Sequence, residues 1–550
     1  MTSVAAAKPN LLVLLDALRP SLDRYFQSLE SDKVTPGDLP SVLRKKLQLG
    51  GDELGPTSDG ITSTAELIQI VESILNNSTK TASPRFLDKL FAGSDAIGQI
   101  SELIIAILNT NTHVYSVSPV ATLLEHEIIA AFSNLIGFPT LCSGVFLPGG
   151  SHSNLTAMTS ARNLLYPEVK QKGIARSGIF LTAFTSIESH YSIDKSAIVL
   201  GLGLEGIVKI PTAGLGSGID TLALKKSLQE SFKKGETPYF VNLTAGTTVL
   251  SSWDDIEAAC AAIKEVEQEF SVRIWVHVDG SYGGPAVFSP VHRAALLKGL
   301  ETVDSFTINP HKILGVPLQC SLLLVNSHRE LGRDALWRAN GLRADYLFHD
   351  APPTISPAVD IPIREGEEDN GYMMGLGDAT IGCGRRTDSI KLYLSWKYHG
   401  SLGYQRRVEN AFNRIQSLSK KLQTNPYFHL VLPYSDDAHA TLSCSFWCIP
   451  ETLLSQHGPI QELLEKDRDF ANKILKNVTL AVHTELTRRG KFMIDYMGLP
   501  SQNLAPFVRV CISSSEIGEL FLEDLVVELE SIIKRCRVSG ADAFISVNEE

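Results

Sequence analysis

The sequence predicts an α/β fold, with a large domain on a mainly parallel sheet and a smaller α+β C-terminal domain. Between about residues 116 and 395, short apolar runs typical of strands alternate with helix-like stretches, which is the pattern of βα units in a parallel sheet. After residue 396, helices alternate with fewer strands. The chain has 550 residues, which is longer than one core usually supports. We therefore expect an N-terminal segment at 1–115, a large domain at 116–395 and a small domain at 396–550.

The N-terminal segment is expected to be helical. Breaks rich in Ser, Thr, Gly and Asp at 50–64 and 76–84 predict loops between its helices. Asp16 and Arg19 interrupt the first apolar stretch, and no basic region precedes it. This pattern predicts an amphipathic helix and argues against a signal peptide.

The large domain is expected to contain a series of buried strands. The runs with strand character are Ser177–Ala183, Gly206–Ile210, Tyr239–Leu243, Val272–Val278, Ser305–Ile308 and Ser321–Val325. In the small domain, Thr441–Ile449 alternates polar and apolar residues and predicts a strand, whereas Ile517–Ile533 has apolar residues at helical spacing. Between the two domains, Asp350–Gly377 carries prolines, acids and glycines without periodicity, and its length is typical of a functional loop.

Composition and charge narrow the classes of partner. The formal net charge is −11 and no cluster of Lys and Arg dominates, which argues against nucleic-acid binding. No run of about 18 apolar residues occurs, so no membrane span is expected. The eight cysteines form no CxxC pair, Cys444 and Cys448 being the nearest, and core thiols in a reducing cytosol are expected instead of a metal site. Small metabolites are the expected partners.

Two segments place an acid and an amine after strand-like runs. Asp279 follows Val276–Val278, and Lys312 follows Ser305–Ile308. If these strands are parallel neighbours, joined by a helix through Arg293–Thr302, both residues lie at the carboxyl edge of the sheet, where α/β folds bind ligands. Pyridoxal chemistry uses this pair: the amine forms an imine, and the carboxylate keeps the pyridine nitrogen protonated.

Two further segments suit the same cofactor. Pro148–Asn154 is a glycine-rich turn that opens a helix, and free N–H groups at a helix start suit a phosphate. A plain turn capped by Ser151 or Ser153 is the structural alternative. His190, on a loop after a strand-like run, can stack on a flat ring, although a lone histidine is more often an ordinary surface or core residue.

Together these motifs resemble the group II pyridoxal-phosphate-dependent decarboxylases of fold type I, and most closely their glutamate and cysteine-sulfinate branch. The resemblance covers roughly residues 85 to 535 and is carried by Pro148–Asn154, Ser189–Ser192, Thr244–Thr248, His277–Gly284, Asn309–Ser321, Cys383–Asp388 and Phe507–Val510. It implies a seven-stranded, mainly parallel sheet and a homodimer whose active sites lie at the interface, with the N-terminal segments packing across the partner.

The resemblance also implies individual roles. Lys312 matches the imine lysine, Asp279 the partner of the pyridinium and His190 the ring-stacking histidine. Ser151, His152, Asn309 and His311 match positions that hold the phosphate, and Thr248 matches one near the ring. Arg509 matches an arginine that binds the substrate α-carboxylate, with an ion pair to a surface acid as the alternative.

The expected reaction is decarboxylation of an L-amino acid, with an acidic substrate (glutamate, aspartate or cysteine sulfinate) favoured. Asn111, in Asn109–Asn111, resembles an asparagine that helps to read the side-chain carboxylate. In contrast, Asp88 stands where that branch usually shows a different residue, and it either repels an acidic side chain or lies on a helix surface. Basic or aromatic substrates, transamination and decarboxylation coupled to oxygen-dependent deamination stay open. A catalytically silent homologue is disfavoured because Lys312, Asp279 and His190 are all present.

The proton donor is expected on the loop at 350–377. In the family, a loop tyrosine protonates the intermediate after carbon dioxide leaves, and a phenylalanine there diverts the reaction toward an aldehyde. Counting back from Gly377, the family's tyrosine position falls on Asn370, and Tyr372 is the only tyrosine in the loop. We therefore assign the role to Tyr372, with a plain surface tyrosine as the alternative.

Overall fold

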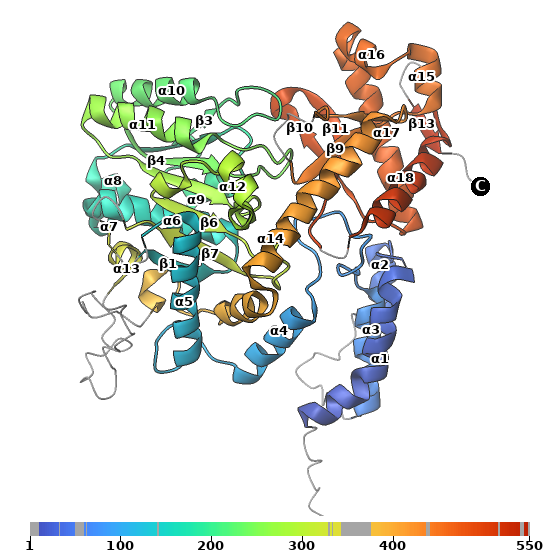
Figure 1. Ribbon diagram of the computed structural model, residues 1–550, viewed down its shortest axis with the longest axis horizontal. Helices are drawn as coiled ribbons and strands as arrows, with labels where there is room; N and C mark the ends of the chain where they lie inside the picture. The colour runs from blue at the N-terminus through green and yellow to red at the C-terminus, as the bar shows by residue number, and fades with distance from the viewer. Residues whose placement is uncertain are drawn as a thin grey trace, which may run out of the picture.

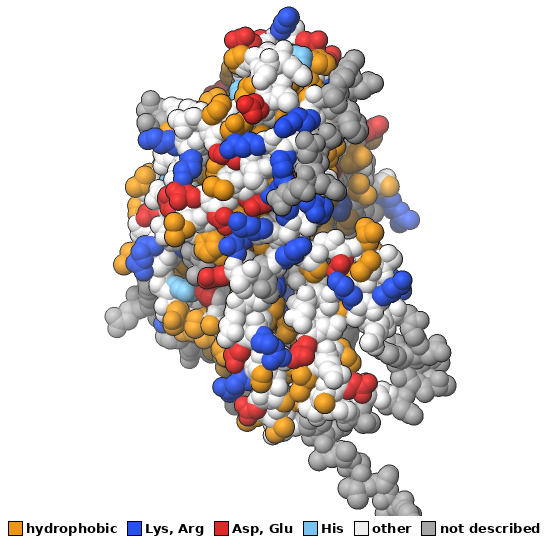
Figure 2. All heavy atoms as spheres, turned by 90° about the vertical axis from the view of Figure 1, so that its right-hand side faces the viewer, with side chains coloured by type: hydrophobic (Ala, Val, Ile, Leu, Met, Phe, Trp, Pro, Cys, Tyr) orange, Lys and Arg blue, Asp and Glu red, His pale blue; other side chains and the backbone are white. Residues whose placement is uncertain are grey.

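The computed structural model describes residues 10–547 apart from 32, 50–59, 62, 140–141, 328–330, 333, 343–375, 436–440, 515–516 and 540–543. Figure 1 shows the chain as a large sheet flanked by helices, a C-terminal part beside it, and an N-terminal helical pair that projects from the body. Within the described residues, no helix has the length and apolar character that a bilayer crossing requires. On the face shown in Figure 2, acidic and basic side chains are interspersed among apolar ones.

The large sheet has seven strands in the order β1-β7-β6-β5-β4-β2-β3. The pairs from β6 through β5, β4 and β2 to β3 are parallel, and only β7 runs antiparallel to its neighbours β6 and β1. The strands are β1 (Ser143–Leu147), β2 (Leu181–Ser186), β3 (Ile207–Ile210), β4 (Thr237–Thr244), β5 (Trp275–Gly280), β6 (Ser305–Ile308) and β7 (Ser321–Val325). The predicted mainly parallel seven-stranded sheet is confirmed.

Several predicted strand limits were wrong. The run predicted at Ser177–Ala183 begins in a short helix, α8 (Ile174–Ser177), which ends at Gly178 in the left-handed conformation, φ 72°. The run predicted at Val272–Val278 starts later because α11 (Ile256–Phe270) ends at Ser271, so β5 covers Trp275–Gly280. β1 was not among the predicted strands.

The sheet is buried on both faces. Successive residues of β5 point to opposite sides, so Val276 and Val278 join one core cluster and Trp275 joins the other. The first cluster includes residues of α11 such as Ile263, and the second includes residues of α6 such as Met158. The helices around the sheet are α5 (Pro119–Ile136), α6 (Gly150–Leu165), α7 (Pro167–Lys172), α9 (Ser192–Val199), α10 (Thr221–Lys233), α11, α12 (Pro290–Leu296) and α13 (Ala335–Asn340).

The C-terminal part is α+β, as predicted. Its antiparallel sheet has the order β10-β11-β9-β8, with β8 (Phe428–Leu430), β9 (Ser443–Cys448), β10 (Asp495–Leu499) and β11 (Leu504–Cys511). Its helices are α14 (Asp388–Gln423), α15 (Glu451–His457), α16 (Ile460–Lys466), α17 (Arg468–Arg489) and α18 (Glu519–Ile533), and β12 (Cys536–Ser539) pairs with β13 (Phe544–Val547). β9 and α18 fall within the strand and the helix predicted at 441–449 and 517–533.

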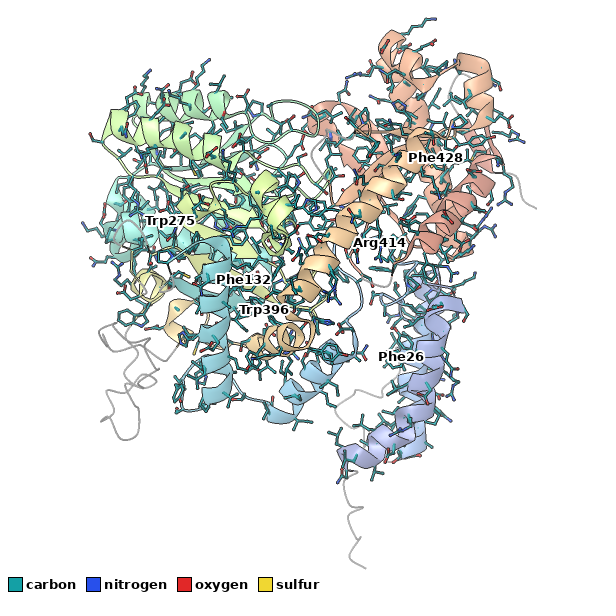
Figure 3. The ribbon with its side chains drawn as sticks, in the orientation of Figure 1. Phe26, Phe132, Trp275, Trp396, Arg414 and Phe428 are labelled. Carbon is teal, nitrogen blue, oxygen red and sulfur yellow. The ribbon has the colours of Figure 1, made fainter. Side chains whose placement is uncertain are left out.

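The helix α14 joins the two sheets. It has non-helical backbone angles at Gly400, and the predicted boundary at 395/396 falls inside it. Near this point the Trp396 ring packs on Phe132 of α5, with ring centroids 5.0 Å apart (Figure 3). Phe288 contacts both rings, at 5.8 Å from Phe132 and 5.3 Å from Trp396. This aromatic cluster fixes the start of the C-terminal part against the large sheet.

The N-terminal segment is helical, as predicted. Its helices are α1 (Leu11–Ser31), α2 (Pro40–Lys46), α3 (Thr64–Asn77) and α4 (Ala96–Leu108). α3 begins at Ser63, whose side chain accepts a hydrogen bond from the Glu66 backbone N–H. α1 and α3 lie side by side, away from the large sheet (Figure 1).

Candidate active site

Asp279 and Lys312 lie at the carboxyl edge of the large sheet. β5 and β6 are parallel neighbours, and Asp279 of β5 pairs with Thr307 of β6. Lys312 follows the end of β6, and its backbone N–H donates to the carbonyl of Asn309 at 3.0 Å. The connection between the two strands contains α12 (Pro290–Leu296) and a 3-10 turn at Leu300–Thr302, so the predicted helix through Arg293–Thr302 had the wrong limits. The local order of strand, acid, helix, strand and lysine therefore places both groups at one edge of the sheet, where their charges interact.

Lys312 has the electrostatic properties of an amine that loses its proton easily. Burial and the positive charge of Arg509 lower the pKa of Lys312 and Asp279 raises it, so that the pKa lies at about 8. The Nζ atom lies 5.7 Å from the centre of the Tyr282 ring. The nucleophilic, uncharged amine is therefore a minor form near neutral pH, but it is far more populated than for an ordinary lysine.

Asp279 is buried and yet ionised. Its Oδ1 accepts from the Ser281 backbone N–H at 2.9 Å, and its Oδ2 accepts from Asn154 Nδ2 at 2.8 Å. Burial raises the pKa of Asp279, but the hydrogen bonds from Ser281 and Asn154 outweigh it and hold the pKa below its usual value. A buried carboxylate of this kind can keep a ring nitrogen protonated.

His190 follows β2 and lies near both groups. Its Nδ1 is 2.8 Å from the hydroxyl oxygen of Ser192, and the Ser192 backbone N–H donates to the same nitrogen at 3.3 Å. Burial lowers the pKa of His190, against the opposing effect of Asp279. The half-buried ring is therefore mainly uncharged at neutral pH and has its orientation fixed by Ser192.

The glycine turn before α6 forms a cradle. Gly149 has φ 119°, a conformation that favours glycine, and α6 begins at Gly150. A Cβ at Gly150 would lie 2.3 Å from Ser281 Oγ and 3.0 Å from Asn309 Nδ2, so these three residues meet closely. Ser151 and His152 are exposed on the first turn. The His152 and Ser153 N–H groups donate to the Gly149 carbonyl at 3.0 and 3.2 Å, so the Gly150 and Ser151 N–H groups are the ones that precede the helix ladder.

This cradle fits a phosphate. The buried Ser281 hydroxyl has no hydrogen-bond partner among the described residues, and Asn309 Nδ2, on the same side of Gly150, can donate to a phosphate oxygen. Polar atoms buried in this way are costly unless a ligand satisfies them. His311 is also buried, and its Nδ1 lies 2.5 Å from the Cys320 carbonyl oxygen and 3.0 Å from the Cys320 backbone nitrogen, which leaves Nε2 for a ligand. Burial and the neighbouring Lys312 lower the pKa of His311 to about 4.

Arg509 reaches the site from the C-terminal sheet. Its Nη1 donates to the Thr248 carbonyl at 2.6 Å, and its Nη2 donates to the Asp88 carbonyl at 3.1 Å. Its Nε is buried without a partner among the described residues. The alternative of a surface ion pair is poorly matched: Arg509 is only 1% exposed, and its Nη2 lies 3.9 Å from Asp495, whose same oxygen is 2.6 Å from Lys89.

The structure does not place the remaining predicted residues next to Lys312 and Asp279. Asn111 accepts from the Arg385 backbone N–H at 2.8 Å, and within the described chain it forms no hydrogen bond with the other predicted site residues. Asp88 is 3% exposed and lies outside any helix, so the expectation that it could sit on a helix surface was wrong. Tyr372 and most of the loop at 350–377 lie outside the described residues.

Sequence reasoning missed four polar residues around Asp279 and His190: Asn154, Ser192, His277 and Ser281. Each lies inside a motif that carried the family resemblance. Asn154 contacts both Asp279 and Ser192, and His277 contacts Asn154. Their position in those motifs was the only indication in the sequence, because the contacts join segments that are far apart along the chain.

Comparisons with known proteins identify the family of the chain. The family model described as "Pyridoxal-dependent decarboxylase conserved domain" matches residues 57–449. An L-aspartate decarboxylase of Metarhizium robertsii is 37% identical over 396 residues, 72% of each chain, and mouse cysteine sulfinic acid decarboxylase is 32% identical over 502 residues, 91% of each chain. The crystal structure of mouse CSAD superposes with a TM-score of 0.81 at 29% identity, covering 95% of this chain and 98% of that one.

The fold has more distant relatives as well. The structure of rice TDC with PLP and tryptamine superposes with a TM-score of 0.76 at 22% identity, covering 96% of this chain and 98% of that one. The family match spans the glycine cradle, the acid and the lysine described above. The chain therefore belongs to the pyridoxal-dependent decarboxylases and is a pyridoxal-phosphate-dependent carboxy-lyase.

Proposed function

We propose that this carboxy-lyase decarboxylates an acidic L-amino acid, namely glutamate, aspartate or cysteine sulfinate, to the amine and carbon dioxide. The observation that carries the proposal is Arg509, a buried guanidinium whose recorded hydrogen bonds go to backbone carbonyls. The acidic preference is supported by the names of the relatives, an L-aspartate decarboxylase, cysteine sulfinic acid decarboxylases and a Drosophila melanogaster glutamate decarboxylase, the last 30% identical over 521 residues.

Arg509 anchors the substrate α-carboxylate. A guanidinium has five N–H donors, and the carbonyls of Thr248 and Asp88 take one from each terminal nitrogen. The donors that are left suit the two oxygens of a carboxylate. Because Asp495 is shared with Lys89, its charge only partly offsets that of Arg509.

Pyridoxal phosphate, when bound, supplies the aldehyde and the electron-accepting ring. Lys312 would hold it through the uncharged amine, and Asp279 would keep the ring nitrogen protonated. His190 would stack on the ring. Ser151, His152, Asn309 and His311 would hold the phosphate, and Thr248, whose carbonyl accepts from Arg509, would lie near the ring.

The side-chain carboxylate of the substrate is bound near Asp88 and Asn111. The pKa of Asp88 is raised by burial and by Asp495, which weakens its charge, and Lys89 Nζ lies 3.2 Å from Asp88 Oδ2. This pairing reduces the repulsion that Asp88 alone would exert on an acidic substrate. Asn111 keeps its Nδ2 donor for the substrate because its Oδ1 is already bonded to Arg385.

After carbon dioxide leaves, Tyr372 donates a proton to Cα.

The protein works as a homodimer in the cytoplasm, with the N-terminal segment 1–115 packing across the partner. The segment precedes a large domain at 116–395 and a small domain at 396–550. Exposed apolar residues on α1 and α3, such as Leu12 and Ile74, support the dimer. All eight cysteines lie among the described residues and none forms a disulfide, which supports a reducing compartment.

One experiment tests the function. A panel of acidic, basic and aromatic L-amino acids is assayed with the purified holoenzyme for carbon dioxide, amine, aldehyde and peroxide together. We expect carbon dioxide and amine in equal amounts from at least one of the three acidic substrates, and none from the Lys312→Ala variant. Turnover confined to basic or aromatic substrates contradicts the acidic preference, and aldehyde with peroxide as the main products contradicts simple decarboxylation.

A further inference from the structure

Asn154 of α6 is the centre of a buried hydrogen-bond network beneath the site. Its Nδ2 is 2.8 Å from Asp279 Oδ2 and 2.9 Å from Ser192 Oγ. Its Oδ1 is 3.1 Å from His277 Nε2. Asn154 is 1% exposed, so this one amide connects three elements without contact with solvent.

The direction of each hydrogen bond can be worked out from Asp279. An ionised carboxylate only accepts, so the Asn154 NH₂ group faces Asp279 and its carbonyl faces His277. The His277 proton is therefore on Nε2. Burial lowers the pKa of His277 to about 4, so the ring is uncharged at neutral pH and Nδ1 accepts a hydrogen bond.

The contacts on the other side of His277 agree with a proton on Nε2. Ser305 Oγ lies 2.8 Å from His277 Nδ1 and must donate its proton to that nitrogen. Its free lone pairs can then accept the Trp275 indole N–H, which lies 2.8 Å from the same oxygen and can only donate. Trp275 is buried within β5 (Figure 3), so this end of the network is also fixed. Each donor has one acceptor.

The second N–H of Asn154 determines, through Ser192, which nitrogen of His190 carries the proton. Ser192 Oγ accepts from Asn154, so its own proton is free to go to His190 Nδ1, 2.8 Å away. The Ser192 backbone N–H donates to the same nitrogen. With two donors directed at Nδ1, the uncharged His190 ring carries its proton on Nε2.

We propose that Asn154 is a positioning residue that acts on both groups of the site: it holds the Asp279 carboxylate directly, and through Ser192 it fixes His190 as the uncharged tautomer with the proton on Nε2. His190 then presents an N–H donor, and not a lone pair, to the cofactor and substrate. The inference rests on the proposed roles of Asp279 and His190, but the tautomer itself does not depend on which substrate is used.

The test measures the tautomer without substrate or cofactor. The apoenzyme is labelled with ¹⁵N-histidine, and the signals of His190 among the 14 histidines are identified by their loss in His190→Gln. In the wild type we expect Nδ1 to show the shift of an unprotonated acceptor and Nε2 that of a protonated nitrogen. In Asn154→Ala and in Ser192→Ala we expect a mixture of the two tautomers.

Cofactor affinity separates the effect of Asn154 on Asp279 from its effect on His190 through Ser192. Asn154→Ala removes a hydrogen bond to a buried charge, so we expect the Kd for pyridoxal phosphate to rise about tenfold or more. Ser192→Ala keeps the Asn154–Asp279 contact, and its Kd should change about threefold or less. The matched control is Asn163→Ala, a buried amide on the same helix that donates to the Ala339 carbonyl, which should alter neither property.

A wild-type His190 with its proton on Nδ1 overturns the proposal. So does an Asn154→Ala variant that matches Asn163→Ala in both tautomer and affinity. If Asn154→Ala does not fold, the wild-type and Ser192→Ala spectra still decide the tautomer. A failure of the amino-acid panel would leave these spectra unchanged, so the two proposals fail separately.

Discussion

Arg509 and Thr248 are joined by a hydrogen bond of 2.6 Å from Nη1 to the backbone carbonyl. Arg509 lies on β11 of the C-terminal sheet, and Thr248 follows β4 of the large sheet. The contact therefore connects the two sheets at the site. A guanidinium held in this way is positioned before any substrate arrives, which reduces the entropy lost on binding.

Replacing Arg509 with lysine should reduce kcat/KM by roughly 100-fold, because a lysine keeps the charge but loses the planar pair of donors. Cofactor absorbance should stay normal, since Arg509 is not expected to hold the cofactor. Steady-state kinetics and the visible spectrum measure the two effects. The control is Arg489→Lys. Arg489 is a partly buried arginine of α17 that is paired with Glu485 of the same helix and with Glu528 of α18. Unchanged catalytic efficiency in Arg509→Lys would remove Arg509 from the site.

The rate at which the apoenzyme takes up pyridoxal phosphate should depend on pH. The pKa of Lys312 is lowered to about 8, so the reactive uncharged amine is the minor form below that pH and the rate should rise as pH increases through about 8. The charge of Arg509 lowers this pKa and that of Asp279 raises it. Arg509→Gln should therefore move the midpoint to higher pH, and Asp279→Asn should move it to lower pH.

Stopped-flow absorbance at a series of pH values measures these midpoints. A pH-dependent change in the cofactor itself would shift all three proteins equally, so opposite shifts in the two variants are specific to Lys312. Shifts of the same sign would contradict the electrostatic account.

Gly150→Ala should weaken cofactor binding about tenfold or more while the protein stays folded. The new Cβ would lie 2.3 Å from Ser281 Oγ, and this hydroxyl must rotate away from the cradle to make room. Equilibrium dialysis gives the Kd, and thermal unfolding of the apoenzyme reports on the fold. Gly382→Ala, a glycine substitution at a position with no atom near the added Cβ and, like Gly150, no left-handed φ, is the control. Wild-type affinity in Gly150→Ala would show that the phosphate lies elsewhere.

Tyr372→Phe should still release carbon dioxide but produce less amine and more aldehyde, with oxygen consumed, because the proton donor to Cα is lost. The ratio of amine to aldehyde, measured under air and under nitrogen, checks this expectation. Tyr398→Phe, an exposed tyrosine on α14, is the control. An unchanged ratio in Tyr372→Phe would show that this tyrosine has no part in the reaction.

The sequence by itself predicted the residues that follow single strands. Asp279 comes directly after a short apolar run, Lys312 follows the next strand by four residues, and a parallel pair of neighbouring strands brings their ends to one edge. This argument needs only local pattern and the usual geometry of βα units. The helical N-terminal segment and the α+β C-terminal part could be predicted for the same reason. β1 was not predicted as a strand, because its Ser-Gly start leaves only Val145–Leu147 as an apolar run.

The tertiary structure alone decided the contacts between distant segments. Arg509 and Thr248 are 261 residues apart along the chain, and Asn154 and Asp279 are 125 apart. No local pattern encodes such pairs, since they depend on how the two sheets and α6 pack against one another. The ionised state of Asp279, the lowered pKa of Lys312 and the tautomer inferred for His190 all follow from those pairs, because burial and hydrogen-bond partners, and not residue type, determine where a buried proton lies.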